Sequence, residues 1–378
     1  MAADPIAAAI DRAVHAGVFP GAVLAVSLRR RVIALRAFGM AASRPAPEPL
    51  NVDTVYDLAS LTKPFATATA VALLLQDGRL SLEDRLERHF PEFDGRPLGA
   101  ATLFHLLNHS SGLPGWRPLY KSLGDRHRLE PGSLGRHAPS AAAIDLIAQE
   151  PLLHSPGEQS IYSDLGFILL GIVIERVSGL GLADFCKSRI YDPLDAHPLC
   201  FLRVGAEPAA IEQDGLRLPV APTEYVAWRG GLLRGEVHDD NAYALGGVAG
   251  HAGLFGTAAA LLKVSGAWLR SYHGVDDFLD PAVARRFTAR QSTPGSRWGL
   301  GWDTPSAPSS SGRYFSARSF GHLGFTGTSV WVDPTIELEI VLLSNRVHVD
   351  PDNAKIQQFR PLIHDAVYEE VIERRDAH

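Results

Sequence analysis

Residues 60–78 read SLTKPFATATAVALLLQDG, and the rest of the chain is best interpreted outward from them. The Ala-rich, apolar run predicts a helix from Ser60 to Asp77 that ends at Gly78, a residue suited to a helix C-terminus. Serine and lysine three positions apart lie about one turn apart on one side of a helix, so Lys63 can reach the Ser60 hydroxyl. Such an amine can act as the base that a serine nucleophile needs. A helix cap with a surface lysine would give the same four residues, so this motif alone leaves both interpretations open.

A second group of polar residues, Tyr162-Ser163-Asp164, precedes an apolar helix predicted at residues 165–178. A phenol can donate or accept a proton, so Tyr162 placed beside Ser60 could move a proton between the nucleophile and a leaving group. The alternative interpretation is a packed aromatic side chain at the start of a helix.

A third group lies late in the chain, where residues 322–327 read HLGFTG. Gly324 and Gly327 allow a ligand to approach the backbone of a strand closely, and a backbone N–H there could point at a developing oxyanion. The alternative interpretation is a strand with a bulge.

Taken together, the three groups resemble the S-x-x-K, Y-x-N and K-T-G motifs of serine β-lactamases and penicillin-binding proteins, in the same order along the chain. The resemblance is nearest to the class C β-lactamases and their esterase and muramoyl-peptide amidase relatives. Connecting segments at residues 78–84, 106–113, 156–158 and 169–171 also resemble those of this family. The resemblance covers residues 21–345, which is most of the chain.

The resemblance implies a role for each matching residue. Ser60 is expected to be the acylated nucleophile, Lys63 the neighbour that accepts or relays its proton, and Tyr162 the group that protonates the leaving group. The backbone N–H groups of Ser60 and Phe325 are expected to form the oxyanion hole, where one donor is worth about 3 kcal/mol. The residues expected to contact substrate are Asp164, His322, Gly324, Thr326 and His238.

Two departures from the family motifs bear on the substrate. His322 and Leu323 stand where β-lactamases have Lys and Thr, and leucine offers no hydroxyl to a drug carboxylate, so we expect inefficient β-lactam recognition. Asp164 stands where an Asn amide would donate a hydrogen bond, and an ionised carboxylate can only accept. It is expected to favour an N–H group or a cation, or to pair with Lys63 and keep it protonated. Such a pair would move the role of general base toward Tyr162 or the substrate.

Segments 221–225, 235–242 and 250–254 resemble the branch of the family that includes amidases acting on muramoyl-peptides of the cell wall. Residues His238, Asp239 and His251 in these segments could also be read as metal ligands. No H-E-x-x-H or other tight ligand spacing supports that interpretation, so neither a metal nor a cofactor is expected.

The pattern of elements predicts an α+β fold of the β-lactamase/transpeptidase type. Helices are expected at residues 4–17, 102–109, 141–150 and 257–269, with another starting in a capping box at residues 81–84 and a last one from Asn353. Strands are expected at 21–39, as a pair around a basic turn, and at 298–302, 319–323, 329–333 and 337–344. Both chain ends should therefore share one antiparallel sheet flanked by helices, and the middle should form a mostly helical subdomain.

We expect a single domain over residues 1–378, with 1–60 and 255–378 in the sheet part and 61–254 in the helical part. Long loops are expected at 113–139, as a possible lid over the site, and at 205–252.

Composition excludes several classes of protein. The 378 residues are 46% apolar and 21% charged, which is ordinary for a globular chain. The net charge of −6 argues against a nucleic-acid partner, and no apolar run is long enough to span a membrane. No secretory signal is visible in the first 20 residues, so a cytoplasmic location is expected. Two cysteines, Cys186 and Cys200, cannot form a disulfide framework.

The sequence therefore predicts a serine hydrolase that forms an acyl-enzyme with a small ester or amide, and a muramoyl-peptide from peptidoglycan is the leading substrate. The alternatives are a carboxylesterase, a weak β-lactamase or D-Ala carboxypeptidase, and a catalytically silent protein that binds cell-wall fragments. The sequence does not indicate an oligomeric state.

Overall fold

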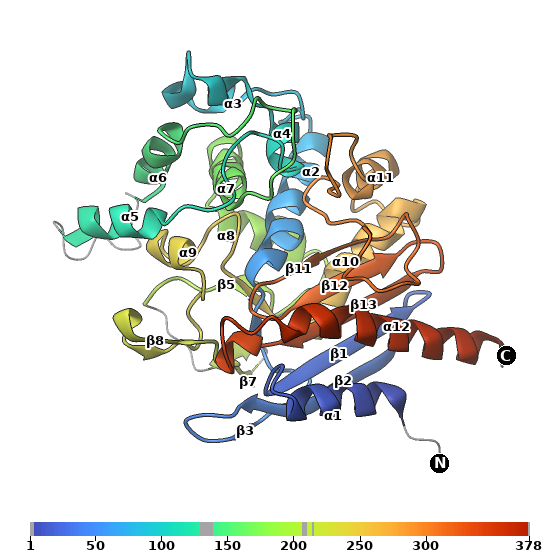
Figure 1. Ribbon diagram of the computed structural model, residues 1–378. Helices are drawn as coiled ribbons and strands as arrows, with labels where there is room; N and C mark the ends of the chain where they lie inside the picture. Colours follow the sequence, from blue (N-terminus) through green and yellow to red (C-terminus); the bar gives the residue numbers. More distant parts are fainter. Residues whose placement is uncertain (1–3, 129–138, 206–209, 214, 377–378) are drawn as a thin grey trace.

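A six-stranded antiparallel sheet joins the two ends of the chain (Figure 1). The computed structural model describes residues 4–128, 139–205, 210–213 and 215–376. The helices are α1 (Pro5–His15), α2 (Thr69–Gln76), α3 (Leu86–His89), α4 (Leu103–Leu107), α5 (Leu119–Arg128), α6 (Pro139–Ala148), α7 (Asp164–Ser178), α8 (Leu182–Cys186), α9 (Asp240–Ala244), α10 (Ala258–His273), α11 (Pro281–Thr288) and α12 (Lys355–Asp376). The strands are β1 (Gly21–Leu28), β2 (Arg31–Ala42), β3 (Glu48–Pro49), β4 (Tyr56–Asp57), β5 (Cys200–Phe201), β6 (Ala210–Gln213), β7 (Leu216–Pro219), β8 (Tyr225–Val226), β9 (Gly231–Leu232), β10 (Leu254–Gly256), β11 (Phe320–Leu323), β12 (Ser329–Asp333) and β13 (Leu338–Ser344).

The strand order in the sheet is β11-β12-β13-β1-β2-β3. The N-terminal strand β1 pairs antiparallel with the C-terminal strand β13, in a register that runs from Ala22 opposite Ser344 to Leu28 opposite Leu338. Strands β1 and β2 form a hairpin whose two turn residues, Arg29 and Arg30, have φ of 49° and 65°. This is the backbone that a two-residue hairpin turn requires, because its twist matches that of the flanking strands.

Alternation along the strands gives the sheet two apolar faces. On β1, Leu24 and Val26 pack with α1 and α12, whereas Val23 and Ala25 belong to the core on the opposite face. Helix α10 covers that opposite face by packing on β1 and β13. The sheet therefore lies between the two terminal helices and the helical part of the chain (Figure 1). The predicted α+β fold, with a sheet built from both chain ends, is confirmed.

The helical part is organised around α7, whose residues from Leu165 to Ile174 are all buried. The helical segment that follows Ser60 packs against it. This segment begins with one 3₁₀ turn (Ala59–Leu61), continues as a wide π-helical stretch (Lys63–Ala68) and becomes regular in α2. Wide turns of this kind inside helices are frequent at functional sites.

Several predicted elements differ from the structure. Residues 81–84 form a turn in which the Asp84 carboxylate accepts the Ser81 N–H, and α3 begins only at Leu86. Residues 298–302 are not a strand, because their pairing is limited to an isolated bridge between Trp298 and Asp303. Helices α8 and α11 have no counterpart in the prediction.

The two predicted long loops are partly ordered. Helix α5 occupies residues 119–128 of the first, and residues 129–138 lie outside the described residues. The second contains β6 to β9 and α9, and residues 206–209 and 214 also lie outside the described residues.

Among the residues that the structure describes, no single helix has both the length and the apolar composition needed to cross a membrane. One pair of helical segments, Asp164–Ser178 and Leu182–Tyr191, meets those criteria when joined, but it is bent by 74°.

Candidate active site

Ser60 follows a strained turn at the end of β4. The preceding residue, Ala59, has φ of 48°, a left-handed conformation that costs a non-glycine residue about 1–2 kcal/mol. The buried Asp57 carboxylate holds this turn by accepting the Ala59 N–H at 2.8 Å. On the other side, the Thr62 hydroxyl donates to the Ala59 carbonyl at 2.6 Å. These bonds fix where the Ser60 side chain enters the site.

Lys63 is fully buried, and all its polar contacts are in the site. Its Nζ atom lies 2.9 Å from Ser60 Oγ, and it donates to the His251 carbonyl at 3.1 Å. It also forms an ion pair with Asp164 Oδ1 at 2.7 Å and lies over the Tyr162 ring, 4.9 Å from its centre. The structure thus brings the three residues that the sequence expects to be catalytic to one point, together with Asp164.

Burial and the Asp164 carboxylate together set the protonation states of Lys63 and Tyr162. Burial by itself would lower the pKa of Lys63, but the Asp164 carboxylate outweighs it, and the pKa of Lys63 is raised. Burial also raises the pKa of Tyr162, although the nearby Lys63 cation opposes this effect. At neutral pH the site therefore holds a lysine ammonium ion and a neutral phenol.

The start of α7 presents Tyr162 and Asp164 to Ser60. Ser163 caps the helix by accepting the Gly166 N–H, and its own hydroxyl donates to the Pro114 carbonyl at 2.7 Å. The Ser163 N–H donates to His109 Nδ1 at 3.1 Å, and the His109 ring packs on Tyr162 with centres 4.6 Å apart. Asp164 is in the first turn of α7, where the helix dipole favours a negative charge.

The loop before β10 supplies the His251 carbonyl that Lys63 contacts. This loop can approach α7 closely because residue 250 is glycine, where an added Cβ would lie 2.1 Å from the Phe167 carbonyl oxygen. His251 Nε2 lies 2.8 Å from the Asp239 carboxylate, so the buried His251 and the partly exposed Asp239 form a pair. Within the described ranges, no cluster of three or more His, Cys, Asp or Glu side chains is placed to hold a metal ion.

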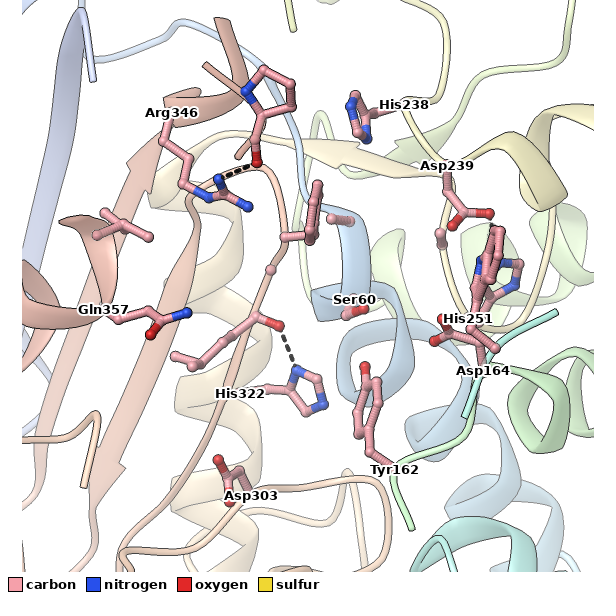
Figure 2. A pocket seen from close by; sticks show the side chains of 18 of the residues that line it. Ser60, Tyr162, Asp164, His238, Asp239, His251, Asp303, His322, Arg346 and Gln357 are labelled. Atoms are coloured by element: carbon pink, nitrogen blue, oxygen red, sulfur yellow. Dashed lines mark hydrogen bonds and ion pairs between the residues drawn. The ribbon is translucent and has the colours of Figure 1, made fainter. Parts of the chain in front are cut away.

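His322 lies on β11, and Figure 2 shows its ring beside Tyr162. Its Nδ1 is 2.8 Å from the Leu323 carbonyl, so Nδ1 carries the proton and Nε2 is left as a buried acceptor without a partner. Burial, reinforced by the Lys63 cation, lowers the pKa of His322 to about 3. The ring is therefore neutral at pH 7 and cannot supply the positive charge that a lysine in its place would.

The turn after β11 places Phe325 next to Ser60. The Thr326 and Thr328 hydroxyls donate to the carbonyls of Asp57 and Leu58, at 2.8 and 3.2 Å. Thr326 was expected to contact substrate, but its hydroxyl is used in this internal bond and its side chain is buried. Gly324 is required here, since an added Cβ would lie 2.0 Å from Thr328 Oγ1. The turn is thus tied to the segment that carries Ser60.

These residues surround an open cavity of about 810 Å³. Figure 2 shows Ser60 near its centre, with Tyr162 and Asp164 on one side and Arg346 and Gln357 on the other. His238, expected to contact substrate, lines the cavity, bonds to Glu224 at 2.8 Å and stacks on the Phe325 ring. The cavity residues that the sequence did not indicate include Trp116, Trp298, Arg346, Gln357 and Arg360.

A serine bonded to a buried lysine, beside a tyrosine that lines the same open cavity, is an arrangement typical of serine hydrolases. The comparisons with known proteins agree. Residues 6–363 match the family model described as Beta-lactamase, and the chain belongs to this family of serine hydrolases.

Named relatives cover most of the chain. It is 31% identical over 371 residues to an N-acetylmuramyl-L-alanine amidase of Bacillus subtilis (strain 168), an alignment that spans 91% of this chain and 81% of the relative. It is 30% identical over 370 residues to a putative D-alanyl-D-alanine carboxypeptidase of Salmonella agona (strain SL483), spanning 92% and 83%. Among solved structures, EstCE1, a hydrolase with promiscuous acyltransferase activity, has a similar fold, with a TM-score of 0.71, 24% identity and coverage of 97% of this chain and 98% of that one. The predicted β-lactamase/transpeptidase-like fold and serine hydrolase class are confirmed.

Proposed function

We propose that this enzyme hydrolyses an amide or ester through an acyl-enzyme on Ser60, with muramoyl-peptides as its substrate class. The observation that carries the proposal is the contact of 2.9 Å between Ser60 Oγ and the fully buried Lys63 Nζ, at the floor of an open cavity. A buried cation held against a single hydroxyl is suited to stabilising the alkoxide character that develops during attack.

In the proposed reaction, Tyr162 first loses its phenolic proton to solvent, and Ser60 Oγ then attacks the substrate carbonyl while its own proton passes to the phenolate oxygen of Tyr162. Because Asp164 keeps Lys63 protonated, Lys63 acts here as the cation that stabilises the developing phenolate and not as the first base. The carbonyl oxygen becomes an oxyanion that accepts hydrogen bonds from the Ser60 and Phe325 N–H groups. Tyr162 then donates the proton to the leaving amine or alcohol as the C–N or C–O bond breaks. Water completes the cycle by the same steps and releases the acid.

The substrate class is inferred from the relatives and from the site. A muramoyl-peptide amide is favoured because the amidase relative is 31% identical over 91% of this chain. The neutral His322 disfavours a β-lactam substrate, because it offers no positive charge to the carboxylate of the drug. The same feature supports a second candidate, a carboxylesterase acting on acyl compounds outside the cell wall.

The first experiment measures the mass of the intact protein after brief mixing with p-nitrophenyl acetate, with the Ser60→Ala variant as the control. We expect a transient gain of one acetyl group on the wild-type protein and none on the variant. Release of amino acid or peptide from muramoyl-peptides, with turnover lost in Ser60→Ala, would then identify the amidase. Turnover of simple esters without muramoyl-peptide cleavage would favour the carboxylesterase. A folded wild-type protein that forms no adduct and turns over neither substrate would overturn the proposal and favour a silent binding protein.

A further inference from the structure

Two arginines reach the cavity from the C-terminal part of the chain. Arg346 follows β13, and Arg360 lies on α12, and both are more than nine-tenths buried. Both line the same cavity as Ser60. In Figure 2, Arg346 and Gln357 lie on the side of Ser60 opposite Asp164 and His251.

Neither guanidinium has a carboxylate partner. Arg360 donates through Nη2 to the Gly324 and Thr328 carbonyls, at 2.8 and 2.7 Å, and its Nε has no hydrogen-bond partner. Arg346 donates through Nη1 to the Pro351 and Asn353 carbonyls, at 2.8 and 3.0 Å. No acidic side chain in the described part of the chain lies within 4 Å of either arginine.

The other charged groups around Ser60 are paired. Lys63 pairs with Asp164, Asp239 with His251, and Arg297 with Asp303 at 3.1 Å. Asp240, also at the cavity, has Arg229 at 3.4 Å. The charges of Asp350 and the cavity residue Asp352 act on Arg346, but within the described residues neither aspartate makes an ion pair with the two arginines.

An unpaired buried charge is costly, and two such charges next to each other also repel. Their carbonyl partners satisfy some N–H groups but do not neutralise the charge. The neighbouring aromatic face of Phe325, 4.5 Å from the Arg346 guanidinium, compensates only a fraction of it. An anion held in this part of the cavity would remove the imbalance, and the planar fork of a guanidinium matches a carboxylate.

We propose that Arg346 and Arg360 form a subsite for a carboxylate group of the substrate, on the Phe325 side of Ser60. This inference rests on the proposed acyl-transfer function and narrows its substrates to acidic acyl compounds or acidic leaving groups. Because His322 on β11 is neutral, the positive charge that recognises the substrate comes from Arg346 and Arg360. The substrate would then lie across Ser60, with its carboxylate at the two arginines and its other end toward Asp164.

The test compares two matched pairs of esters. One pair places the carboxylate in the acyl group, as p-nitrophenyl hydrogen glutarate against p-nitrophenyl methyl glutarate. The other places it in the leaving group, as 3-acetoxybenzoate against methyl 3-acetoxybenzoate. We expect kcat/KM to favour the acid over the neutral ester by about tenfold or more in at least one pair. The pair that shows the preference identifies the side of the scissile bond that faces the arginines.

The variant Arg346→Met should reduce that ratio toward one, and Arg346→Lys should retain part of it. Arg286→Met, an exposed arginine on α11 outside the cavity, is the matched control and should leave the ratio unchanged. Melting temperatures establish that each variant is folded. Equal rates for acid and neutral esters in both pairs, or a ratio that persists in a folded Arg346→Met variant, would overturn the proposal.

A binding measurement tests the carboxylate subsite independently of the proposed hydrolytic function. Calorimetry with the Ser60→Ala variant compares each acidic ester with its neutral partner in the absence of turnover. Tighter binding of an acidic ester would support the subsite even if the wild-type protein hydrolysed none of the esters. Absence of any acidic preference in binding would contradict the subsite even if Ser60 were readily acylated.

Discussion

The ion pair between Lys63 and Asp164 governs the protonation state of the site. A carboxylate at 2.7 Å holds the pKa of the buried Lys63 above its usual value. Replacing the carboxylate by an amide, in Asp164→Asn, removes this effect while burial remains, so the pKa of Lys63 falls. An opposite charge at this distance typically shifts a pKa by about 1–3 units. We therefore expect the pH profile of ester turnover to move to lower pH by about one unit or more.

The measurement is kcat/KM against pH for p-nitrophenyl acetate, in the wild-type protein and in Asp164→Asn. The matched control is Asp184→Asn, an exposed aspartate on α8. A rise in turnover that leaves the shape and position of the profile unchanged would show that Asp164 does not set the charge of Lys63.

His322 stands where the family motif has a lysine, and the surroundings of this position disfavour a positive charge. The position is buried and adjacent to Lys63, which is why the pKa of His322 is lowered to about 3. A lysine there would bring a second ammonium ion into a site that already disfavours positive charge. We expect His322→Lys to increase penicillin hydrolysis by less than about tenfold and to lower the melting temperature. A larger gain in benzylpenicillin kcat/KM, with no loss of thermal stability, would refute this expectation.

At the scale of elements, the turn after β11 and the turn before Ser60 form one unit. The Thr326 hydroxyl bonds to the Asp57 carbonyl, and Thr328 bonds to Leu58, so the two proposed oxyanion donors are held at a fixed separation. The variant Thr326→Val keeps the shape of the side chain but loses this bond. We expect kcat for ester hydrolysis to fall about tenfold, less than the ~10²-fold loss from removing an oxyanion donor outright.

Steady-state kinetics with p-nitrophenyl acetate check this prediction. Thr288→Val is the control, because Thr288 is also buried and bonded to a backbone carbonyl but lies on α11. If Thr326→Val lowered the melting temperature as Thr288→Val does but left kcat unchanged, the coupling between the two turns would have no role in catalysis.

The elements that the sequence predicted well carry strong local patterns. Strands β1 and β13 are mostly apolar and almost entirely buried, and α7 combines a serine cap with an apolar body. The segment around Trp298 resembles a strand because its large apolar residues alternate with glycine, yet the Trp298 ring packs on His109 and Tyr162. Its conformation depends on contacts that are distant in sequence. Ser60, Lys63 and Tyr162 could be found from the sequence because they lie in local motifs. Arg346 and Arg360 could not, because only contacts that are distant in sequence bring them to the site.

At the scale of the whole molecule, the cavity is formed by segments spread between residues 59 and 360. Ser60 comes from the segment after β4, Asp164 from α7, His251 from the loop before β10 and Arg360 from α12. The antiparallel pairing of β1 with β13 makes this possible. It places α12, which follows β13 in the chain, beside a site whose first residues come from the N-terminal part. A change in the global stability of the fold should therefore affect the geometry of the site.

The global stability itself should depend on pH. Burial lowers the pKa of six histidines, namely His89, His105, His109, His322, His348 and His364. Below about pH 6.5 the unfolded chain binds protons at these residues while the folded protein does not, so stability falls with falling pH. Burial raises the pKa of four carboxyl groups, those of Asp57, Asp240, Asp303 and Glu339, and these act in the opposite sense, since the folded protein takes up their protons first. The six histidines outnumber the four carboxyl groups, and we expect the melting temperature to fall from pH 7 to pH 4.5.

His364 isolates one of these contributions away from the catalytic cavity. It is fully buried on α12, bonds to the Ser310 carbonyl at 2.8 Å through Nδ1, and has a pKa lowered to about 4. A difference of one bound proton changes the free energy of unfolding by about 1.4 kcal/mol per pH unit. The variant His364→Gln removes that proton from the unfolded chain, so its melting temperature should fall less steeply between pH 6.5 and pH 4.5, whatever its stability at pH 7.5. Thermal melts at these pH values test this, with the exposed His15→Gln as control, and parallel slopes in His364→Gln and the wild-type protein would contradict it.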